Sequence, residues 1–261
     1  MQSIKNWFTG LGNNLSDLGK VISENVGSLL LFLALMVAII AIASWAEKII
    51  CKQNGIRKND KFKLHRITLV AVMSAAALIL NLIRFEIILF YKLDFAEIPA
   101  IIGAFSMGPV AGVMIEFVRI ILNLIFTGTD TAFVGEVADV LFGCSFILPA
   151  SIIYYKNKTR KAAIKGLVIG TVVAVAVGAV LNGALMIPTY AKLYMHSDTI
   201  EPIISMGTGK ISAVSGIWTF LALIVVPFNL LKYGAVSIIT MFIYKPVSHL
   251  IKQQSDSATG K

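Results

Sequence analysis

The sequence is poor in charged residues and in cysteine, and each scarcity excludes a class of protein. Only 14% of its 261 residues are charged, whereas a soluble domain usually carries about 25%. Its two cysteines, Cys51 and Cys144, are too few for the disulfide framework of a small secreted domain. The three histidines lack the spacing of metal ligands. The sequence therefore predicts neither a soluble domain nor a metal centre.

The motifs of soluble enzymes are also missing. Residues 206–210, MGTGK, resemble a phosphate-binding loop, but Ile204 and Ile211 stand where the Walker spacing requires glycine and serine or threonine. No Ser/His/Asp order and no metalloprotease helix is present. We therefore expect no enzyme and no ATP hydrolysis by this chain itself. An intramembrane enzyme is disfavoured for the same reason.

Long apolar runs are what the sequence has in abundance. It is 57% hydrophobic, with a mean hydropathy of +0.83, and several runs approach the roughly 20 residues that a spanning helix needs. The alternation typical of a porin-like barrel is not visible. These features predict an all-α polytopic membrane protein. The net charge of +9 is then interpreted as basic cytoplasmic loops rather than nucleic-acid binding.

The apolar runs predict seven spans. Six of them cover residues 27–45, 67–88, 98–107, 110–126, 133–155 and 166–187. The last helix is expected to begin at Pro227, because proline fits the first helical position, with residues 211–226 lying at the outer face. The alternative is one helix that continues through Pro227 with a kink. Residues 1–26 predict an amphipathic helix in the membrane interface or, alternatively, a loosely ordered leader.

Basic loops predict the orientation in the membrane. Residues 46–66 hold seven lysines and arginines against two acidic residues, and residues 156–165 hold five basic residues. The positive-inside rule places both loops in the cytoplasm. The N-terminus and the loops at 90–97 and 189–210 are then external, and the C-terminus is cytoplasmic.

Polar residues near the predicted outer face form a candidate binding site. The loop at 90–97 carries Lys92, Asp94 and Glu97, which indicates either a solvated turn or a loop that closes over a polar ligand. Asn229 and Lys232 are three apart and share a helix face, near the positive N-terminal end of a helix that starts at Pro227. They suit an electron-rich ligand with several hydrogen-bonding groups. The alternative is that Asn229 makes a local cap and Lys232 extends toward the headgroups.

Small residues predict where helices pack closely. Gly166, Gly170, Ala174 and Gly178 recur every four residues and lead to Asn182 at the predicted level of Asn229 and Lys232; the glycines are interpreted as packing. Ala71 and Ala75 form a second pair.

Glu116 and Arg119 lie three apart inside a predicted span. Ionisable residues within a membrane are functional candidates, and an internal structural pair is an equal alternative.

Five segments together resemble one family. The segments KLDFAEIPAIIGAFSMGPVAGV, FTGTDTAFVGEVADVLFG, LPASIIY, LNGALMIPTY and VVPFNLLKYG occur in this order between Leu64 and Tyr244. They resemble the riboflavin-specific substrate-binding (S) component of bacterial energy-coupling factor (ECF) transporters. The resemblance implies a six-helix S-component core plus one extra N-terminal transmembrane helix. The implied division of the chain is a leader at 1–26, the extra helix and basic loop at 27–63, the membrane domain at 64–245 and a cytoplasmic tail at 246–261.

The resemblance also implies a function. It is that of a riboflavin-binding subunit in the bacterial cell membrane, which captures flavin outside and delivers it inward together with a separate transmembrane coupling subunit and two ATPase subunits. Riboflavin is then the transported substrate, and no cofactor is expected. The alternative is a self-sufficient secondary transporter, which predicts midplane ionisable pairs and internal repeats. Only Glu116 and Arg119 fit that alternative, and no repeat is visible.

Motif matching implies roles for individual residues. Leu93 and Asp94 belong to the external loop of the pocket. The remaining polar pocket positions are Asn182, Asn229 and Lys232. Ala71 and Ala75 match the alanine motif that docks on the coupling subunit. Asp139 stands where the family is expected to have asparagine.

Overall fold

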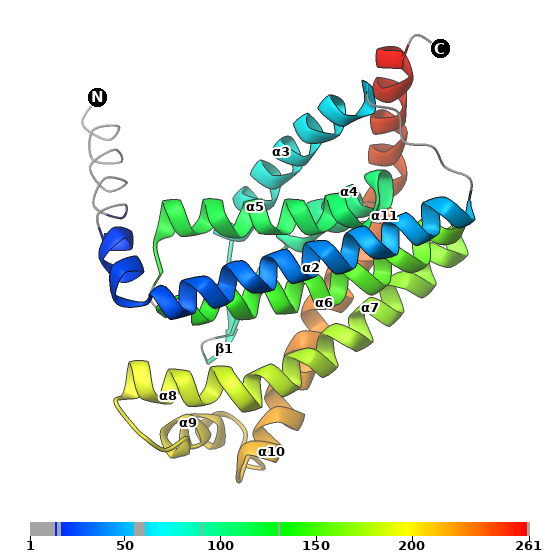
Figure 1. Ribbon diagram of the computed structural model, residues 1–261. Helices are drawn as coiled ribbons and strands as arrows, with labels where there is room; N and C mark the ends of the chain where they lie inside the picture. Colours follow the sequence, from blue (N-terminus) through cyan, green and yellow to red (C-terminus); the bar gives the residue numbers. More distant parts are fainter. Residues whose placement is uncertain (1–13, 15–16, 55–60, 90, 130, 260–261) are drawn as a thin grey trace, which may run out of the picture.

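A computed structural model gives the arrangement of most of the chain. It describes residues 14, 17–54, 61–89, 91–129 and 131–259, with the side chains at 61–65 and 245–259 left out. Most of the predicted leader and part of the basic loop at 46–66 lie outside the described residues, while residues 17–24 are helical. The elements are α2 (Val26–Gln53), α3 (Lys61–Leu82), β1 (Phe85–Ile88), β2 (Tyr91–Leu93), α4 (Glu97–Met107), α5 (Pro109–Thr127), α6 (Val134–Asn157), α7 (Arg160–Leu181), the π-helix η1 (Asn182–Met186), α8 (Ile187–Met195), α9 (Glu201–Lys210), α10 (Ile217–Phe220), the π-helix η2 (Leu221–Val225) and α11 (Val226–Thr259) (Figure 1).

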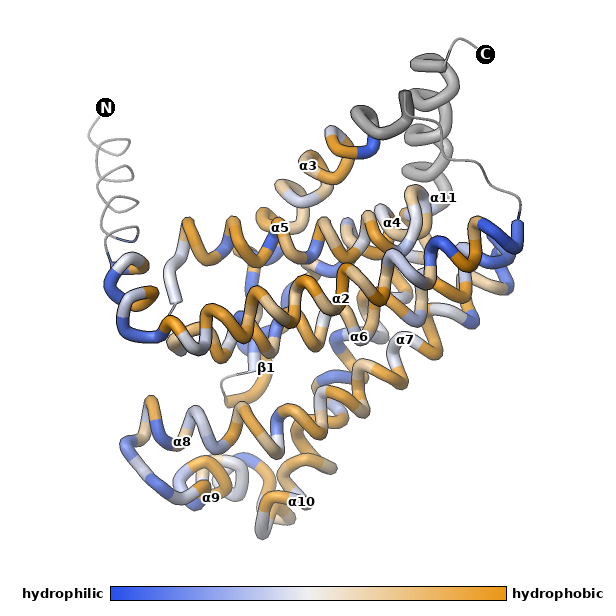
Figure 2. Tube along the Cα trace, viewed as in Figure 1, coloured by the Kyte–Doolittle hydropathy of each residue, from blue (hydrophilic) through white to orange (hydrophobic). Residues whose placement is uncertain are grey.

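The helices are those of a multi-pass membrane protein. Five are long and apolar enough to cross a membrane, and α4 and residues 66–82 of α3 are shorter apolar helices. Figure 2 shows apolar residues along most of α2 and α7 and hydrophilic residues at the end of α2 near Gln53. The predicted all-α membrane class and its six-helix core with an additional N-terminal helix are confirmed.

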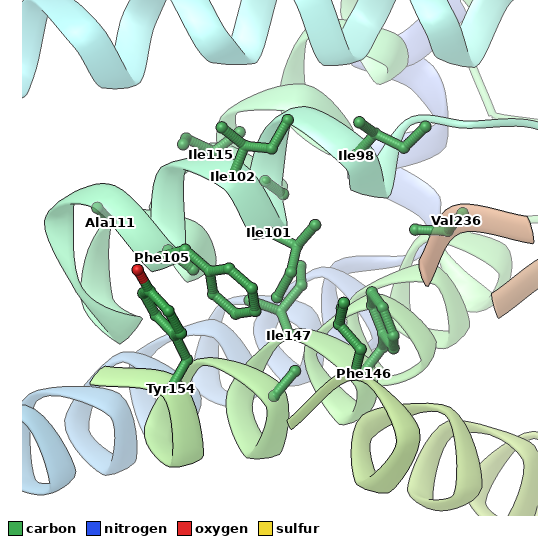
Figure 3. Packing of buried hydrophobic residues seen from close by; sticks show 14 of the residues in the cluster. Ile98, Ile101, Ile102, Phe105, Ala111, Ile115, Phe146, Ile147, Tyr154 and Val236 are labelled. Atoms are coloured by element: carbon green, nitrogen blue, oxygen red, sulfur yellow. The ribbon is translucent and has the colours of Figure 1, made fainter. Parts of the chain in front are cut away.

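The core surrounds α4. After Glu97, this helix is apolar on nearly every side, which is typical of a helix that its neighbours cover; all of its residues except Ser106 are buried. Phe105 of α4 stacks on Tyr154 of α6 with ring centroids 4.2 Å apart. Ile101 and Ile147 lie beside them (Figure 3). Because α4 is held on all sides, its first residue has a fixed position, and so does the end of the loop that leads into it.

The glycine stripe of α7 packs against α6, as predicted. A Cβ at Gly166 would lie 2.5 Å from the carbonyl oxygen of Ala150, and one at Gly170 would lie 2.7 Å from that of Phe146. Real Cβ atoms do not approach a carbonyl this closely, so only glycine permits the observed separation of the two helices. Small residues at such crossings are typical of membrane helices.

The predicted second span at 67–88 is too long at its end. The helix α3 stops at Leu82, and Phe85–Ile88 pairs antiparallel with Tyr91–Leu93 in a two-stranded hairpin. The segment is rich in aromatic and β-branched residues, which favour strand over helix. The apolar run therefore contributes to both a helix and a strand, and residues 91–93 of the candidate loop form the second strand of the hairpin.

The predicted start of the last helix at Pro227 is wrong. Helix begins at Ile217 and continues without a break through η2 into α11. Proline has no N–H to donate, and the turn before it is a wider π turn in which the Val226 N–H bonds the Leu221 carbonyl. The continuous helix through Pro227, which was the alternative, is the observed one. Similarly, α7 runs on through η1 to Met195, so the predicted polar loop at 189–210 is largely helical.

Candidate functional site

One lysine and two carboxylates form the centre of the candidate site. Lys232 of α11 places its Nζ 3.1 Å from Oδ2 of Asp94 and 2.9 Å from Oε1 of Glu97. Asp94 follows strand β2, and Glu97 is the first residue of α4. The structure therefore brings the predicted residues Asp94 and Lys232 together, from positions 138 residues apart in the chain.

Asp94 shapes the loop as well as binding Lys232. Its Oδ1 accepts a hydrogen bond of 3.1 Å from the Ala96 N–H, which turns the chain into α4 in the manner of an Asx turn. Burial raises the pKa of Asp94, but the Lys232 ammonium and the Ala96 hydrogen bond outweigh it and hold the pKa below its usual value. Asp94 is therefore an ionised partner for Lys232.

Glu97, one of the three charged residues of the predicted loop, belongs to this cluster although the motif match gave it no role. One oxygen bonds Lys232; the other, Oε2, is buried and has no hydrogen-bond partner among the described residues. Buried polar atoms in native proteins nearly always find a partner, so this oxygen is available to a ligand hydroxyl or amide. The sequence signal was the spacing of Asp94 and Glu97, which are three residues apart at the start of a helix.

Two buried amides, Asn182 and Asn229, lie close to Gly178 at the end of the glycine stripe. Asn182 Nδ2 donates to the Gly178 carbonyl at 2.8 Å, and Asn182 Oδ1 accepts from the Tyr91 hydroxyl at 2.8 Å. The Asn229 amide nitrogen lies 3.0 Å from the position a Gly178 Cβ would take. Asn182 and Asn229 are therefore at the same level, which was the prediction.

Each of these amides is associated with a π segment. Asn182 opens η1, and Asn229 follows η2 and donates 2.9 Å to the Val225 carbonyl at its end. Single π turns widen a helix and are frequent at functional sites. The predicted contribution of a helix N-terminus is wrong here, because Asn229 and Lys232 lie inside a continuous helix that begins at Ile217. The positive charge at this point is that of Lys232 itself.

Aromatic and apolar side chains surround the polar groups. The rings of Tyr91 and Phe228 are 5.0 Å apart at their centroids and tilted by 41°. Leu93 is half-buried and packs against the same cluster. Burial raises the pKa of Tyr91, so its hydroxyl stays protonated and donates to Asn182. The combination of apolar walls with a few placed polar groups is typical of a small-molecule site.

The intramembrane pair Glu116 and Arg119 is an internal one. Arg119 Nη2 lies 2.6 Å from Glu116 Oε1, and Nη1 donates 3.0 Å to Asn81 Oδ1. Asp139, at the expected asparagine position, approaches the same guanidinium to 3.7 Å. These contacts link α3, α5 and α6 and offset the charge of Arg119.

The alanine pair lies near the middle of α3. Ala71 and Ala75 are both exposed. Ala71 lines an apolar groove of about 310 Å³ between α3 and α5, whose lining residues are Arg66, Ile67, Val70, Ala71, Val110, Ala111, Met114 and Val118. From Ala71 to the end of α3 the chain rises about 16 Å at 1.5 Å per residue, so the groove is well separated from the hairpin.

Comparison with known proteins identifies relatives that match most of this chain over nearly their whole length. Residues 65–244 match the family model described as ECF transporter, substrate-specific component. The riboflavin transporter RibU of Staphylococcus aureus (strain TCH60) is 32% identical over 203 residues, which cover 77% of this chain and 99% of the relative. The riboflavin transporter FmnP of Bacillus subtilis (strain 168) is 29% identical over 196 residues, which cover 74% of this chain and 96% of that relative.

A solved structure agrees with these matches. It is described as the S component of a bacterial ECF transporter and superimposes with a TM-score of 0.53 at 28% identity, covering 72% of this chain and 97% of that chain. Because the family match begins at residue 65, the helix α2 lies outside it.

Proposed function

Because the chain belongs to the family of ECF transporter substrate-specific components, we propose that it is a riboflavin-binding subunit for vitamin uptake. It is a transport component and not an enzyme. It binds riboflavin at the outer face of the membrane and delivers it inward together with a transmembrane coupling subunit and two ATPase subunits. Riboflavin is its substrate, and no cofactor takes part.

The observation that carries this proposal is the convergence of Asn182, Asn229 and Lys232 beside the hairpin. Riboflavin has a flat apolar ring system, a polar ring edge and a hydroxylated ribityl chain. The apolar walls suit the rings, and the amides and ammonium suit the carbonyl and nitrogen acceptors of the edge. The unpartnered oxygen of Glu97 suits a donor on the ligand. The names of the relatives from Staphylococcus aureus and Bacillus subtilis support the same ligand.

Leu93 and Asp94 give the hairpin its role in this proposal. Asp94 joins the hairpin to Lys232, and Leu93 packs on the apolar cluster that contains Tyr91 and Phe228. A ligand entering between the hairpin and α11 exchanges contacts with both residues. The hairpin therefore acts as the external cover of the site.

The coupling face is proposed at Ala71 and Ala75. Both side chains are small and exposed, and Ala71 borders the groove between α3 and α5. Small side chains let a second helix approach the backbone closely in lipid. A helix of the coupling subunit is the proposed occupant, and the energy of ATP hydrolysis reaches this chain through it.

The proposed topology follows the basic loops. The N-terminus and the hairpin are outside, and the C-terminus is in the cytoplasm. The proposed division is the leader at 1–26, the extra helix with its basic loop at 27–63, the riboflavin-binding domain at 64–245 and the tail at 246–261. The leader, the extra helix and the tail all lie outside the family match, which covers residues 65–244.

A binding measurement tests the function directly. The protein is purified in detergent from cells supplied with riboflavin, and the expected result is a flavin absorbance spectrum that copurifies with the protein in an equimolar ratio. Titration of flavin-free protein should quench riboflavin fluorescence at a saturable site. A colourless protein that does not quench riboflavin would refute the assignment. Accumulation of riboflavin in liposomes by this chain alone would support the secondary-transporter alternative instead.

A further inference from the structure

The extra helix α2 is tied to the core through one buried carboxylate. Glu47 is only 1% exposed, which is unusual for a glutamate and requires partners of opposite character. Its Oε2 accepts a hydrogen bond of 2.9 Å from the Val110 N–H, and its Oε1 lies 3.2 Å from Nη2 of Arg66. Glu47 therefore connects α2 to both α5 and α3.

The contact with Val110 caps α5 from another helix. The residue at the N-cap, Gly108, has no side chain to accept a hydrogen bond, and Pro109 has no N–H. The Val110 N–H is thus the first free donor of α5, and helix starts need an acceptor at this point. The carboxylate of Glu47 supplies it, together with a negative charge at the positive end of the helix.

The turn is built to receive this carboxylate. Gly108 has a φ of +106°, and a Cβ there would lie 3.0 Å from the carboxyl carbon of Glu47. A side chain at position 108 would therefore be strained and would crowd Glu47 as well. A second contact holds the same end of α2, because Asn54 Nδ2 donates 3.0 Å to the Lys156 carbonyl at the end of α6.

Along its length, α2 also packs as part of the core. Phe32, Ile39 and Ala43 are buried against Phe117 of α5 and Val140 of α6. The helix is thus held by an apolar seam and by polar contacts at one end, as a member of the bundle rather than a separate anchor.

Both partners of Glu47 also line the groove between α3 and α5. Arg66 is on the α3 wall and Val110 is on the α5 wall. One carboxylate on α2 therefore fixes the relative position of the two walls at one end of the groove. Arg66 is the only charged residue among the groove's lining residues, and Glu47 determines where its guanidinium lies.

We propose that α2 is a positioning element for the coupling face: Glu47 holds Arg66 and the start of α5 so that the groove beside Ala71 accepts the coupling subunit. This inference rests on the proposed coupling function and extends it to a helix outside the family match. Glu47 is a positioning residue. It is only 1% exposed, so it acts on the coupling face through Arg66 and Val110 rather than by contact with riboflavin or the coupling subunit.

Glu47 is too far from the candidate riboflavin site to affect it directly. Gly108 follows the last residue of α4, and Glu97 is the first residue of that helix. The intervening helix of 11 residues is about 16 Å long at 1.5 Å per residue. Loss of Glu47 should therefore separate docking from riboflavin binding, whereas a general folding defect would impair both.

The test uses full-length protein produced together with the coupling subunit and both ATPases. Glu47→Ala removes the cap and the ion pair; Glu47→Gln keeps an acceptor for the Val110 N–H but removes the charge beside Arg66. Arg66→Gln removes the other half of the ion pair. Lys48→Gln is the matched control, since Lys48 is the next residue of α2 and is exposed. Riboflavin Kd and the ratio of copurified coupling subunit are measured for each.

We expect Glu47→Ala to lower the copurified ratio at least fivefold and to change the riboflavin Kd less than twofold. Glu47→Gln and Arg66→Gln should show intermediate losses, and Lys48→Gln should match the wild type. Undiminished copurification of the Glu47→Gln and Glu47→Ala proteins, or a loss of riboflavin binding in parallel with docking, would overturn the inference. Failure of the wild type to copurify the coupling subunit would instead contradict the proposed function.

Discussion

Asn182 and Asn229 are buried amides. Few of their hydrogen-bond donors and acceptors remain free for a ligand, and those few point in fixed directions. Each already spends its N–H on a main-chain carbonyl of its own helix, so the side chains are held in place before a ligand arrives. The amide oxygen of Asn229 and the second N–H of each amide are the groups that remain for the proposed riboflavin ligand. Binding therefore finds oriented groups rather than mobile ones, which reduces the entropy lost on association.

Truncation of either amide should weaken riboflavin binding without unfolding the protein. A neutral hydrogen bond contributes about 0.5–1.5 kcal/mol net, so we expect Asn182→Ala and Asn229→Ala each to raise the riboflavin Kd from a few-fold to about tenfold. Fluorescence-quenching titration measures the effect. Lys192→Ala, on an exposed position of α8, is the control. An unchanged Kd in both amide variants would remove these residues from the site.

Lys232 carries the charge balance of the site, and its removal should cost stability as well as affinity. Without its ammonium, Asp94 and Glu97 remain as two buried carboxylates near each other, and breaking a buried pair in this way typically costs about 3–5 kcal/mol. We expect Lys232→Ala to lower the thermal midpoint of the flavin-free protein far more than Lys192→Ala does. Adding Glu97→Gln should restore part of the loss. A double variant no more stable than Lys232→Ala would contradict the ionic cluster.

At the scale of elements, α7 and α11 approach each other closely at Gly178, which has no side chain. A methyl group at Gly178 would come within 3.0 Å of the Asn229 amide nitrogen, so Asn229 has to move or rotate. We expect Gly178→Ala to raise the riboflavin Kd several-fold. Gly234→Ala is the matched control on α11, because nothing lies within 4 Å of its Cβ position, and alanine is the better helix former by roughly 1 kcal/mol. Equal riboflavin affinity in the two variants would show that Gly178 does not position Asn229.

Run length and spacing predict most of these elements, but not their ends. The length of the apolar runs and the glycine repeat identify the spans, the packing of α7 on α6 and the level of Asn182. The hairpin after Leu82 and the π segments η1 and η2, which precede Pro188 and Pro227, depend on how the chain satisfies its backbone hydrogen bonds in three dimensions. The partnership of Glu97 with Lys232 and that of Glu47 with Val110 join distant positions. No local sequence pattern predicts such contacts. In the sequence, Glu47 is an ordinary charged residue near the end of a helix; in the structure, it is buried and caps the start of α5.

At the scale of the whole molecule, the proposed orientation has a direct chemical test. In a variant without Cys51 and Cys144, a cysteine in place of the exposed Asp198 should react with an impermeant maleimide added to intact cells. A cysteine in place of the exposed Lys161 should react only after the membrane is opened. The reverse pattern would place the hairpin and its site in the cytoplasm, on the wrong side for uptake.

The separation between the two ends of the molecule leads to the last prediction. The proposed riboflavin site is formed by the hairpin, η1, the start of α4 and α11, whereas the groove beside Ala71 is formed by the first halves of α3 and α5. A tryptophan at position 71 fills the groove without reaching the site.

We therefore expect Ala71→Trp to bind riboflavin with a Kd within about twofold of wild type. Riboflavin uptake into cells and copurification of the variant with the coupling subunit should each fall at least tenfold, which corresponds to about 1.4 kcal/mol in free energy of docking. Val72→Trp is the control, because Val72 is the next residue of α3 and is also exposed but does not line the groove; it should transport normally. Normal uptake by Ala71→Trp in cells that depend on it for riboflavin would mean that energy reaches this chain through another surface.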